Sequence, residues 1–372
     1  MKLEIAVIDD GVSKETITDL LFNLEYRDGS IRECKSAISC YSHGSICSAI
    51  IRKYVPDARV GSIRVLGSDK SGEATALLSA IQWCVERDIK ILNLSLGSVE
   101  ACDIPAMSKV VKEAYNKGCI LVAACKNGRN TSYPASLMNV LGVRLDTSLK
   151  GFAYSVNPFP NGGVELSASA DHEVFLSSDA TTYNTQMFNS YASPVITAAV
   201  YELLATGKCE RSFEDVRGSL YRNAGFGTPK SISHSRITSH FERIPCNNTV
   251  PIVAFVGNGA YQLMIDIASR FLRDNYLPLI FTQYADSLSP YCVHINDDTL
   301  LNGFCFAMAE FYGADLILAC VQEDATSRIS HDVIVIDWSL HRKIGNDISN
   351  IITYTDRVEQ DDVYNRLTSI LT

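Results

Sequence analysis

Residues 188–204 read Phe-Asn-Ser-Tyr-Ala-Ser-Pro-Val-Ile-Thr-Ala-Ala-Val-Tyr-Glu-Leu-Leu, and this stretch says most about the architecture of the chain. A single serine before a helix most often serves as its cap. Here Ser190 is followed by Ala-Ser-Pro and a long apolar run, so the proline lies in the first helical turn, where its missing N–H is tolerated. A helix start also favours negative charge. Ser190 is therefore a candidate functional residue.

Three earlier segments carry the other groups that a serine nucleophile needs. Residues 5–11 read Ile-Ala-Val-Ile-Asp-Asp-Gly, residues 42–45 read Ser-His-Gly-Ser, and residues 121–127 read Leu-Val-Ala-Ala-Cys-Lys-Asn. Acyl transfer by serine needs a base, a carboxylate that orients the base, and donors for the oxyanion. The order Asp, His, Ser is the subtilisin order, distinct from the orders of chymotrypsin and the α/β-hydrolases. With Ser190, these segments resemble the subtilase (peptidase S8) family of serine proteases.

The resemblance covers about residues 2–223 and implies a role for one residue in each motif. Ser190 would be the nucleophile, and His43 would take its proton and return it to the leaving amine. Asp9 would hold the tautomer of His43. Asn127 would donate its side-chain amide to the oxyanion.

The aspartate motif contains one ambiguity, because Asp9 and Asp10 are adjacent. In the family the catalytic aspartate comes directly after the apolar strand. We therefore expect Asp9 to face the histidine and Asp10 to stabilise the turn into Gly11.

The resemblance also implies a peptide-binding cleft. An extended substrate would pair with the strand edge at residues 95–97, and residues 123–126 and 132–134 would line the pocket for the residue before the scissile bond. The expected substrate-binding residues are Ser95, Leu96, Gly97, Ala124, Cys125, Lys126 and Ser132.

Two departures from the family pattern lie beside this site. Phe188 stands where the family usually has glycine, and Lys126 stands where it usually has a small glycine. The lysine could pair with an acidic substrate residue, narrow the pocket, or simply reach solvent. Both changes favour a narrow substrate range over general proteolysis.

Composition excludes several other classes of protein. A formal net charge of −9 disfavours a nucleic-acid partner. The apolar runs are shorter than the roughly 18–20 residues that a membrane span needs. Twelve cysteines without a Cys-x-x-Cys pair, and an N-terminus without a signal peptide, indicate reduced thiols in the cytoplasm. We expect no cofactor; the resemblance leaves structural calcium open, but its ligands cannot be placed.

The pattern of strands and helices predicts two α/β domains. Residues 1–223 would form a subtilisin-like three-layer fold with a mostly parallel central sheet, with strands at 4–8, 58–65, 91–97, 119–125 and 139–145 and helices at 16–21, 44–54, 74–87, 104–117, 190–204 and 213–222. Residues 224–249 read as a linker. Residues 250–372 would form a smaller, Rossmann-like α/β domain of unknown role.

The second domain offers one weak motif. Its strands are expected at 251–256, 277–282, 315–320 and 332–337, and its helices at 261–274 and 302–312. The turn Gly257-Asn258-Gly259 between the first strand and helix is similar to a nucleotide-binding turn. The full glycine spacing and a Gly-Lys-Ser/Thr motif are missing, so a turn without a ligand is the favoured interpretation.

The resemblance implies an intracellular serine endopeptidase. The appended domain and altered pocket fit a selective processing enzyme that removes a leader from a peptide precursor. Two alternatives stay open: a catalytically silent peptide-binding scaffold, and a transpeptidase or macrocyclase in which an amine resolves the acyl-enzyme. The expected partner is a peptide or protein substrate. Formation of a homo-oligomer stays open as a further possibility.

Overall fold

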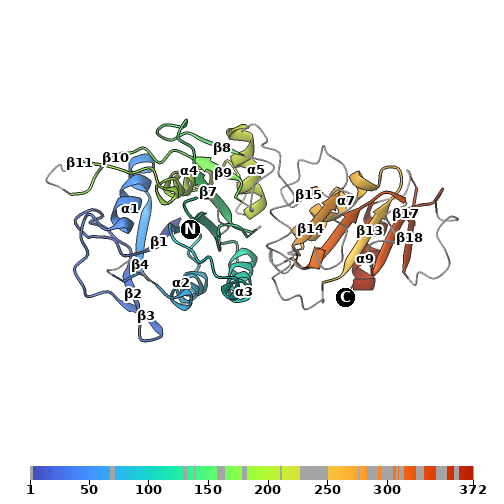
Figure 1. The fold of residues 1–372 in the computed structure, drawn as a ribbon, viewed down its shortest axis with the longest axis horizontal. Coiled ribbons are helices and arrows are strands. Elements are labelled where there is room, and N and C mark those ends of the chain that lie inside the picture. Colours follow the sequence, from blue (N-terminus) through green and yellow to red (C-terminus); the bar gives the residue numbers. More distant parts are fainter. Residues whose placement is uncertain are drawn as a thin grey trace. The chain divides into compact units, whose positions relative to one another are not determined.

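The chain divides into two compact units, residues 1–232 and 233–372, each described here by itself (Figure 1). This boundary lies within the connector predicted at 224–249, which from residue 227 onward lies outside the described residues. The computed structural model describes residues 3–67, 72–128, 132–137, 139–156, 164–177, 182–209, 212–226, 250–274, 276–282, 292–294, 305–306, 309, 314–323, 331–340, 350–355 and 360–371.

The first unit is built on a large, mostly parallel sheet. Within the described residues the strand order is β12 (Gly225–Phe226), β8 (Tyr154–Val156), β9 (Leu166–Ala168), β7 (Leu141–Leu145), β6 (Ile120–Ala124), β5 (Ile91–Leu94), β1 (Glu4–Asp9), β4 (Arg59–Arg64), β2 (Asn23–Arg27) and β3 (Ser30–Glu33). The β2–β3 and β8–β9 pairs are antiparallel, and the others are parallel. A separate antiparallel pair joins β10 (Glu173–Phe175) to β11 (Thr182–Asn184).

Helices cover both faces of this sheet (Figure 1). One face carries α1 (His43–Tyr54) and α4 (Ser193–Ala205), with α5 (Phe213–Asn223) packed on α4; the other carries α2 (Ala74–Glu86) and α3 (Ile104–Asn116). The core between α1, α4 and the sheet buries α4 along most of its length. This burial explains why the sequence of α4 is apolar nearly all round. The predicted three-layer α/β architecture is confirmed.

The strand directions explain how distant motifs meet. The parallel strands β1, β5 and β6 end at the same edge of the sheet, where ligands of such sheets usually bind. Asp9 is the last residue of β1, and Asn127 follows the end of β6. The first residue of α1, His43, and the residues before α4 lie next to this edge.

Two parts of the first unit differ from expectation. The helix predicted at 16–21 is wrong, because this segment forms turns in which the Thr16 hydroxyl donates to the Leu176 carbonyl at 2.7 Å. The β2–β3 hairpin was not predicted. Its turn at Asp28 and Gly29, with φ of 51° and 76°, is the Asp-Gly pair typical of two-residue hairpins. At the end of the unit, Gly225–Phe226 pairs with β8, so these residues belong to the sheet and not to the connector.

The second unit contains a parallel sheet with the order β15 (Cys292–His294), β14 (Pro278–Thr282), β16 (Leu316–Cys320), β13 (Ile252–Val256), β17 (Val333–Asp337) and β18 (Ile351–Tyr354) among the described residues. Helices α7 (Ala260–Arg273) and α9 (Gln360–Leu371) pack against each other. Strands β15 and β18 and helix α9 were not predicted from the sequence. The helix predicted at 302–312 lies largely outside the described residues.

The turn after β13 is explained by packing. A Cβ on Gly257, whose φ is 112°, would lie 2.5 Å from the Cβ of Asp337. The hydroxyl of Tyr354 donates to the carbonyl of Asn258 at 2.8 Å and lies 3.2 Å from that of Val256. The glycine therefore lets β17 and β18 approach this turn, and a ligand is not needed to account for it.

In the described part of the chain, no helix is long and apolar enough to cross a membrane.

Candidate active site

Three side chains that are far apart in the sequence form a relay of hydrogen bonds. Asp9 ends β1, His43 begins α1, and Ser190 lies in the short 3₁₀ turn Asn189–Tyr191 before α4. The Oδ2 atom of Asp9 lies 2.8 Å from Nδ1 of His43, and Nε2 of His43 lies 2.9 Å from Oγ of Ser190. When Nδ1 carries the proton and donates it to Asp9, Nε2 is free to accept the proton of Ser190.

The surroundings of Asp9 strengthen this histidine as a base. Asp9 is 1% exposed, and its second oxygen, Oδ1, accepts the backbone N–H of Asp10 at 2.8 Å. Burial opposes protonation of His43, but the charge of Asp9, the neighbouring Cys47 and the hydrogen bonds to these two side chains together outweigh burial and raise the pKa of the imidazole above its usual value. A histidine with raised proton affinity takes a proton from serine more readily.

Asp10 has a different task. Its carboxylate accepts the backbone N–H groups of His43 at 3.0 Å and Gly44 at 2.8 Å, so it stabilises the start of α1. Burial and the neighbouring Asp9 raise the pKa of Asp10, although these two hydrogen bonds oppose the shift. A Cβ on Gly44 would lie 2.5 Å from the carbonyl oxygen of Gly11, so glycine is needed for this close approach. The structure thus places Asp9, and not Asp10, at the histidine side chain.

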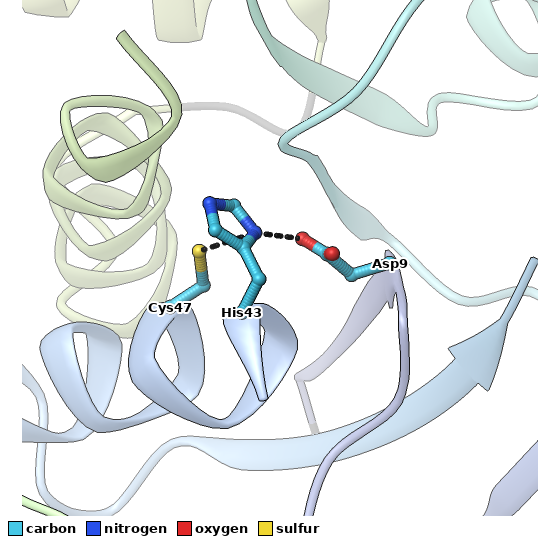
Figure 2. Close-up of side chains that lie close together, drawn as sticks. All are labelled: Asp9, His43 and Cys47. Atoms are coloured by element: carbon cyan, nitrogen blue, oxygen red, sulfur yellow. Dashed lines mark hydrogen bonds and ion pairs between the residues drawn. The ribbon is translucent and has the colours of Figure 1, made fainter. Parts of the chain in front are cut away.

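Cys47 lies one helical turn after His43, and its sulfur lies beside the imidazole (Figure 2). Its sulfur is 3.8 Å from Nδ1 of His43 and donates to the Ser190 carbonyl at 3.6 Å. Complete burial raises the pKa of this thiol, so it is a neutral hydrogen-bond donor. Ser95 contacts the backbone of Ser190. Its Oγ lies 3.3 Å from both the Ser190 carbonyl oxygen and the Cys47 sulfur.

Asp9, His43 and Cys47 are also the one group of metal-ligating side chains that the described residues bring within reach of a shared ion (Figure 2). Calcium takes six to eight oxygen ligands, whereas this group offers one carboxylate, an imidazole and a thiol. The group therefore does not fit calcium. The Nδ1 atom of His43 is already hydrogen-bonded to Asp9, so we interpret these three residues as part of the relay.

The oxyanion residue is held in a defined orientation. The Oδ1 atom of Asn127 accepts the backbone N–H of Asn189 at 3.0 Å. Because a donor faces Oδ1, the amide orientation of the Asn127 side chain is fixed, and its NH₂ group is left as the free end. Within the described residues, the backbone N–H of Ser190 has no protein acceptor. Two N–H donors of this kind are what stabilisation of a tetrahedral oxyanion requires, as predicted for Asn127.

Phe188 does not need the conformational freedom of glycine. Its φ and ψ of −118° and 146° are ordinary extended values. Its side chain is 41% exposed, and its ring centroid lies 6.4 Å from that of Tyr191. The ring of Tyr191 in turn lies 5.0 Å from that of His43. The departure from the family glycine therefore changes the surface beside the nucleophile and leaves the backbone unstrained.

The expected cleft residues after β5 lie beside the nucleophile and a neighbouring loop. Leu96 is half-buried, and Gly97 is exposed. A Cβ on Gly97 would lie 2.5 Å from the carbonyl oxygen of Tyr133, and Ser98 forms an antiparallel bridge with Tyr133. This segment is thus held against residues 132–134, the other predicted wall of the pocket.

The expected cleft residues after β6 divide into buried and exposed groups. Ala124 and Cys125 are buried, while Lys126 is exposed. Ser132 is 2% exposed, and its hydroxyl oxygen accepts the backbone N–H of Lys126 at 2.8 Å. Ser132 therefore supports the pocket wall, and Lys126 is the side chain of this set that a substrate can reach.

Asn189 was not among the site residues predicted from the sequence. Its side chain, 4% exposed, hydrogen-bonds the backbone at the ends of β6 and β7. The signal available was a polar residue directly before the candidate nucleophile, but its partners are backbone groups that the sequence does not reveal.

Several known proteins are similar to this chain in sequence or in structure. A family model described as the subtilase family matches residues 2–243. Subtilisin DY of Bacillus licheniformis is 31% identical over 157 residues, which cover 40% of this chain and 55% of that protein. Thermitase of Thermoactinomyces vulgaris is 28% identical over 194 residues, covering 49% of this chain and 67% of that protein. Among solved structures, sphericase is 19% identical with a TM-score of 0.49, covering 60% of this chain and 83% of that one.

Proposed function

Because this chain belongs to the subtilase family, we propose that it is a serine endopeptidase with Asp9, His43 and Ser190 as its catalytic triad. The observation that carries the proposal is the unbroken relay of 2.8 and 2.9 Å contacts from Asp9 through His43 to Ser190. A peptide-binding scaffold without catalytic activity would need neither this relay nor an Asn127 side chain in a fixed orientation. This geometry therefore favours an enzyme over the silent scaffold.

In the first half of the reaction, Oγ of Ser190 attacks the carbonyl carbon of the scissile bond while Nε2 of His43 takes its proton. The carbonyl electron pair moves to oxygen, and the side-chain amide of Asn127 and the backbone N–H of Ser190 donate to the resulting oxyanion. The Asp9 carboxylate stabilises the imidazolium. His43 then protonates the amine, the C–N bond breaks, and the acyl group stays on Ser190.

In the second half, a water molecule gives its proton to His43 and attacks the acyl carbon. The same donors stabilise the second oxyanion. The proton returns from His43 to Oγ as the ester bond to Ser190 breaks, which releases the acid product. If a peptide amine attacked in place of water, the same residues would make a new peptide bond.

The finer proposal is a selective processing enzyme that removes a leader from a peptide precursor. Two side chains support selectivity: Lys126 is exposed beside the oxyanion residue, and Phe188 is 41% exposed beside the nucleophile. Both are bulkier than the glycine usual in the family, so they restrict which peptides fit. We place this activity in the cytoplasm, since the ten cysteines whose side chains the structure describes are free thiols.

The test is the intact mass of the protein after exposure to a fluorophosphonate probe, with Ser190→Ala as the control. One adduct on the wild type and none on the variant would support the assembled triad, and no adduct on either would overturn it. Incubation with leader-bearing precursor peptides and with casein then tests selectivity. One cut in a precursor with casein left intact supports processing, whereas broad digestion of casein contradicts it. Products that lack the added mass of water would identify transpeptidation.

A further inference from the structure

Asn189, the residue directly before the nucleophile, connects three parts of the site. It lies in the turn that presents Ser190, it is 4% exposed, and it contacts the ends of both β6 and β7. Buried polar side chains are retained where they satisfy specific partners. Its contacts therefore show what it holds together.

The side-chain amide of Asn189 is fully used. Its Nδ2 atom donates to the backbone carbonyls of Cys125 at 3.1 Å and Lys126 at 3.0 Å, and lies 3.2 Å from the Cys125 sulfur. Its Oδ1 atom accepts the backbone N–H of Leu145 at 2.9 Å. One side chain thus satisfies two carbonyls and one N–H group that secondary structure leaves open at these strand ends.

The backbone of Asn189 makes the link to the oxyanion residue. Its N–H donates to Oδ1 of Asn127 at 3.0 Å, and the next N–H along the chain is that of Ser190. Asn127 itself is exposed and follows directly after Lys126, so packing does not hold its side chain. The two oxyanion donors are therefore spaced by the contacts of Asn189.

We propose that Asn189 is a positioning residue for the oxyanion site. Its amide fixes the turn at Ser190 against the end of β6, and so sets the spacing between the Asn127 side-chain amide and the Ser190 N–H. It does not touch the substrate. This inference rests on the proposed peptidase function and adds to it a residue that acts through Asn127.

The chemistry of the contacts explains why asparagine suits this position. Aspartate has nearly the same shape, but it would point an oxygen at the carbonyls of Cys125 and Lys126. Leucine fills a similar volume but leaves these groups and the N–H of Leu145 without a partner, which is costly in a buried site. The amide group supplies two donors and an acceptor within one planar side chain.

The experiment measures fluorophosphonate labelling of the full chain, because formation of the phosphonyl adduct also places negative charge in the oxyanion site. We expect Asn189→Ala to lower the maximal labelling rate roughly 10- to 100-fold, with little change in the probe concentration that gives half-maximal rate. Loss of one oxyanion donor costs about 10²–10³, and displacement of a donor should cost less. The pH dependence should keep its wild-type midpoint, because His43 and Asp9 are unchanged.

A double-mutant cycle with Asn127→Ala tests the route of the effect. If Asn189 acts by spacing the two donors, the double variant should lose clearly less labelling rate than the product of the two single losses. Losses that multiply would overturn the proposal, as would a wild-type rate for Asn189→Ala. Asn139→Ala is the matched control, since Asn139 is also 4% exposed and lies in the turn before β7; it should lower the melting temperature without slowing labelling by the folded protein.

Two further measurements keep the outcome clear. If Asn189→Ala does not fold, Asn189→Ser, which keeps a hydroxyl in the buried position, is measured in the same way. If the wild type itself takes no probe, the proposed function fails before Asn189 is tested. A labelled wild type with an unaffected Asn189 variant refutes the positioning role alone.

Discussion

Replacing Asp9 with asparagine tests the electrostatic part of the relay. The carboxylate lies 2.8 Å from Nδ1 of His43 and is 1% exposed. With an effective dielectric constant of about 20, a charge pair at that distance is worth about 6 kcal/mol. Since about 1.4 kcal/mol corresponds to a factor of ten in rate, Asp9→Asn should slow labelling of Ser190 by about 10⁴-fold. The same scale is known for triads that lose this carboxylate.

The assay is the second-order rate constant of fluorophosphonate labelling, followed by intact mass, with folding checked by circular dichroism. Asp10→Asn is the matched control, because Asp10 binds only backbone N–H groups of α1 in the described structure. It should cost about 1 kcal/mol of stability as a weakened helix cap and change the labelling rate by less than tenfold. Equal losses for both variants, or a loss below tenfold for Asp9→Asn, would refute the assignment.

Three further predictions follow from side chains in the first unit. The pKa of His43 is raised above its usual value of 6.5, and the neutral imidazole must take the Ser190 proton. The rate of labelling should therefore increase with pH through a midpoint above 6.5. A labelling midpoint at or below 6.5 would contradict this. Lys126→Ala should reduce preference for acidic residues before the scissile bond about fivefold in a peptide library, since an exposed ion pair is worth up to about 1 kcal/mol; an unchanged preference would mean that the lysine only reaches solvent. Arg217→Met should lower the free energy of unfolding by about 3–5 kcal/mol, measured by urea denaturation. The reason is that Glu165, which is 1% exposed, would lose its buried ion-pair partner. A loss below about 1 kcal/mol would argue against this ion pair.

The sequence was sufficient for features that depend on local pattern. The order of the strands and helices around Asp9, His43 and Ser190 follows from hydrophobic periodicity and glycine positions, and the structure brings the three side chains together. The adjacent pair Asp9 and Asp10 could be ranked through the resemblance to the subtilases, in which the catalytic aspartate comes directly after the apolar strand. The β2–β3 hairpin could also have been predicted from Asp28-Gly29, whose local signal was overlooked.

Other features depend on contacts that no local pattern encodes. Residues 16–21 have apolar spacing that suggests a helix, but Thr16 bonds the carbonyl of Leu176, 160 positions away. Asn189 was overlooked because its partners are backbone groups at the ends of β6 and β7. In the second unit, the glycines after β13 suit either a ligand or close packing, and the sequence does not reveal the approach of Asp337 that accounts for Gly257 by packing.

The extended backbone at Phe188 has a consequence for how this site can evolve. Because φ is −118°, any amino acid except proline can occupy the position without backbone strain, whereas glycine here would add about 0.5–1 kcal/mol of conformational entropy cost on folding. The side chain stands at the surface beside Ser190, outside the relay. Under the proposed function, mutation at this position can therefore change peptide preference while Asp9, His43 and Ser190 keep their contacts, so substrate choice and chemistry are free to diverge separately.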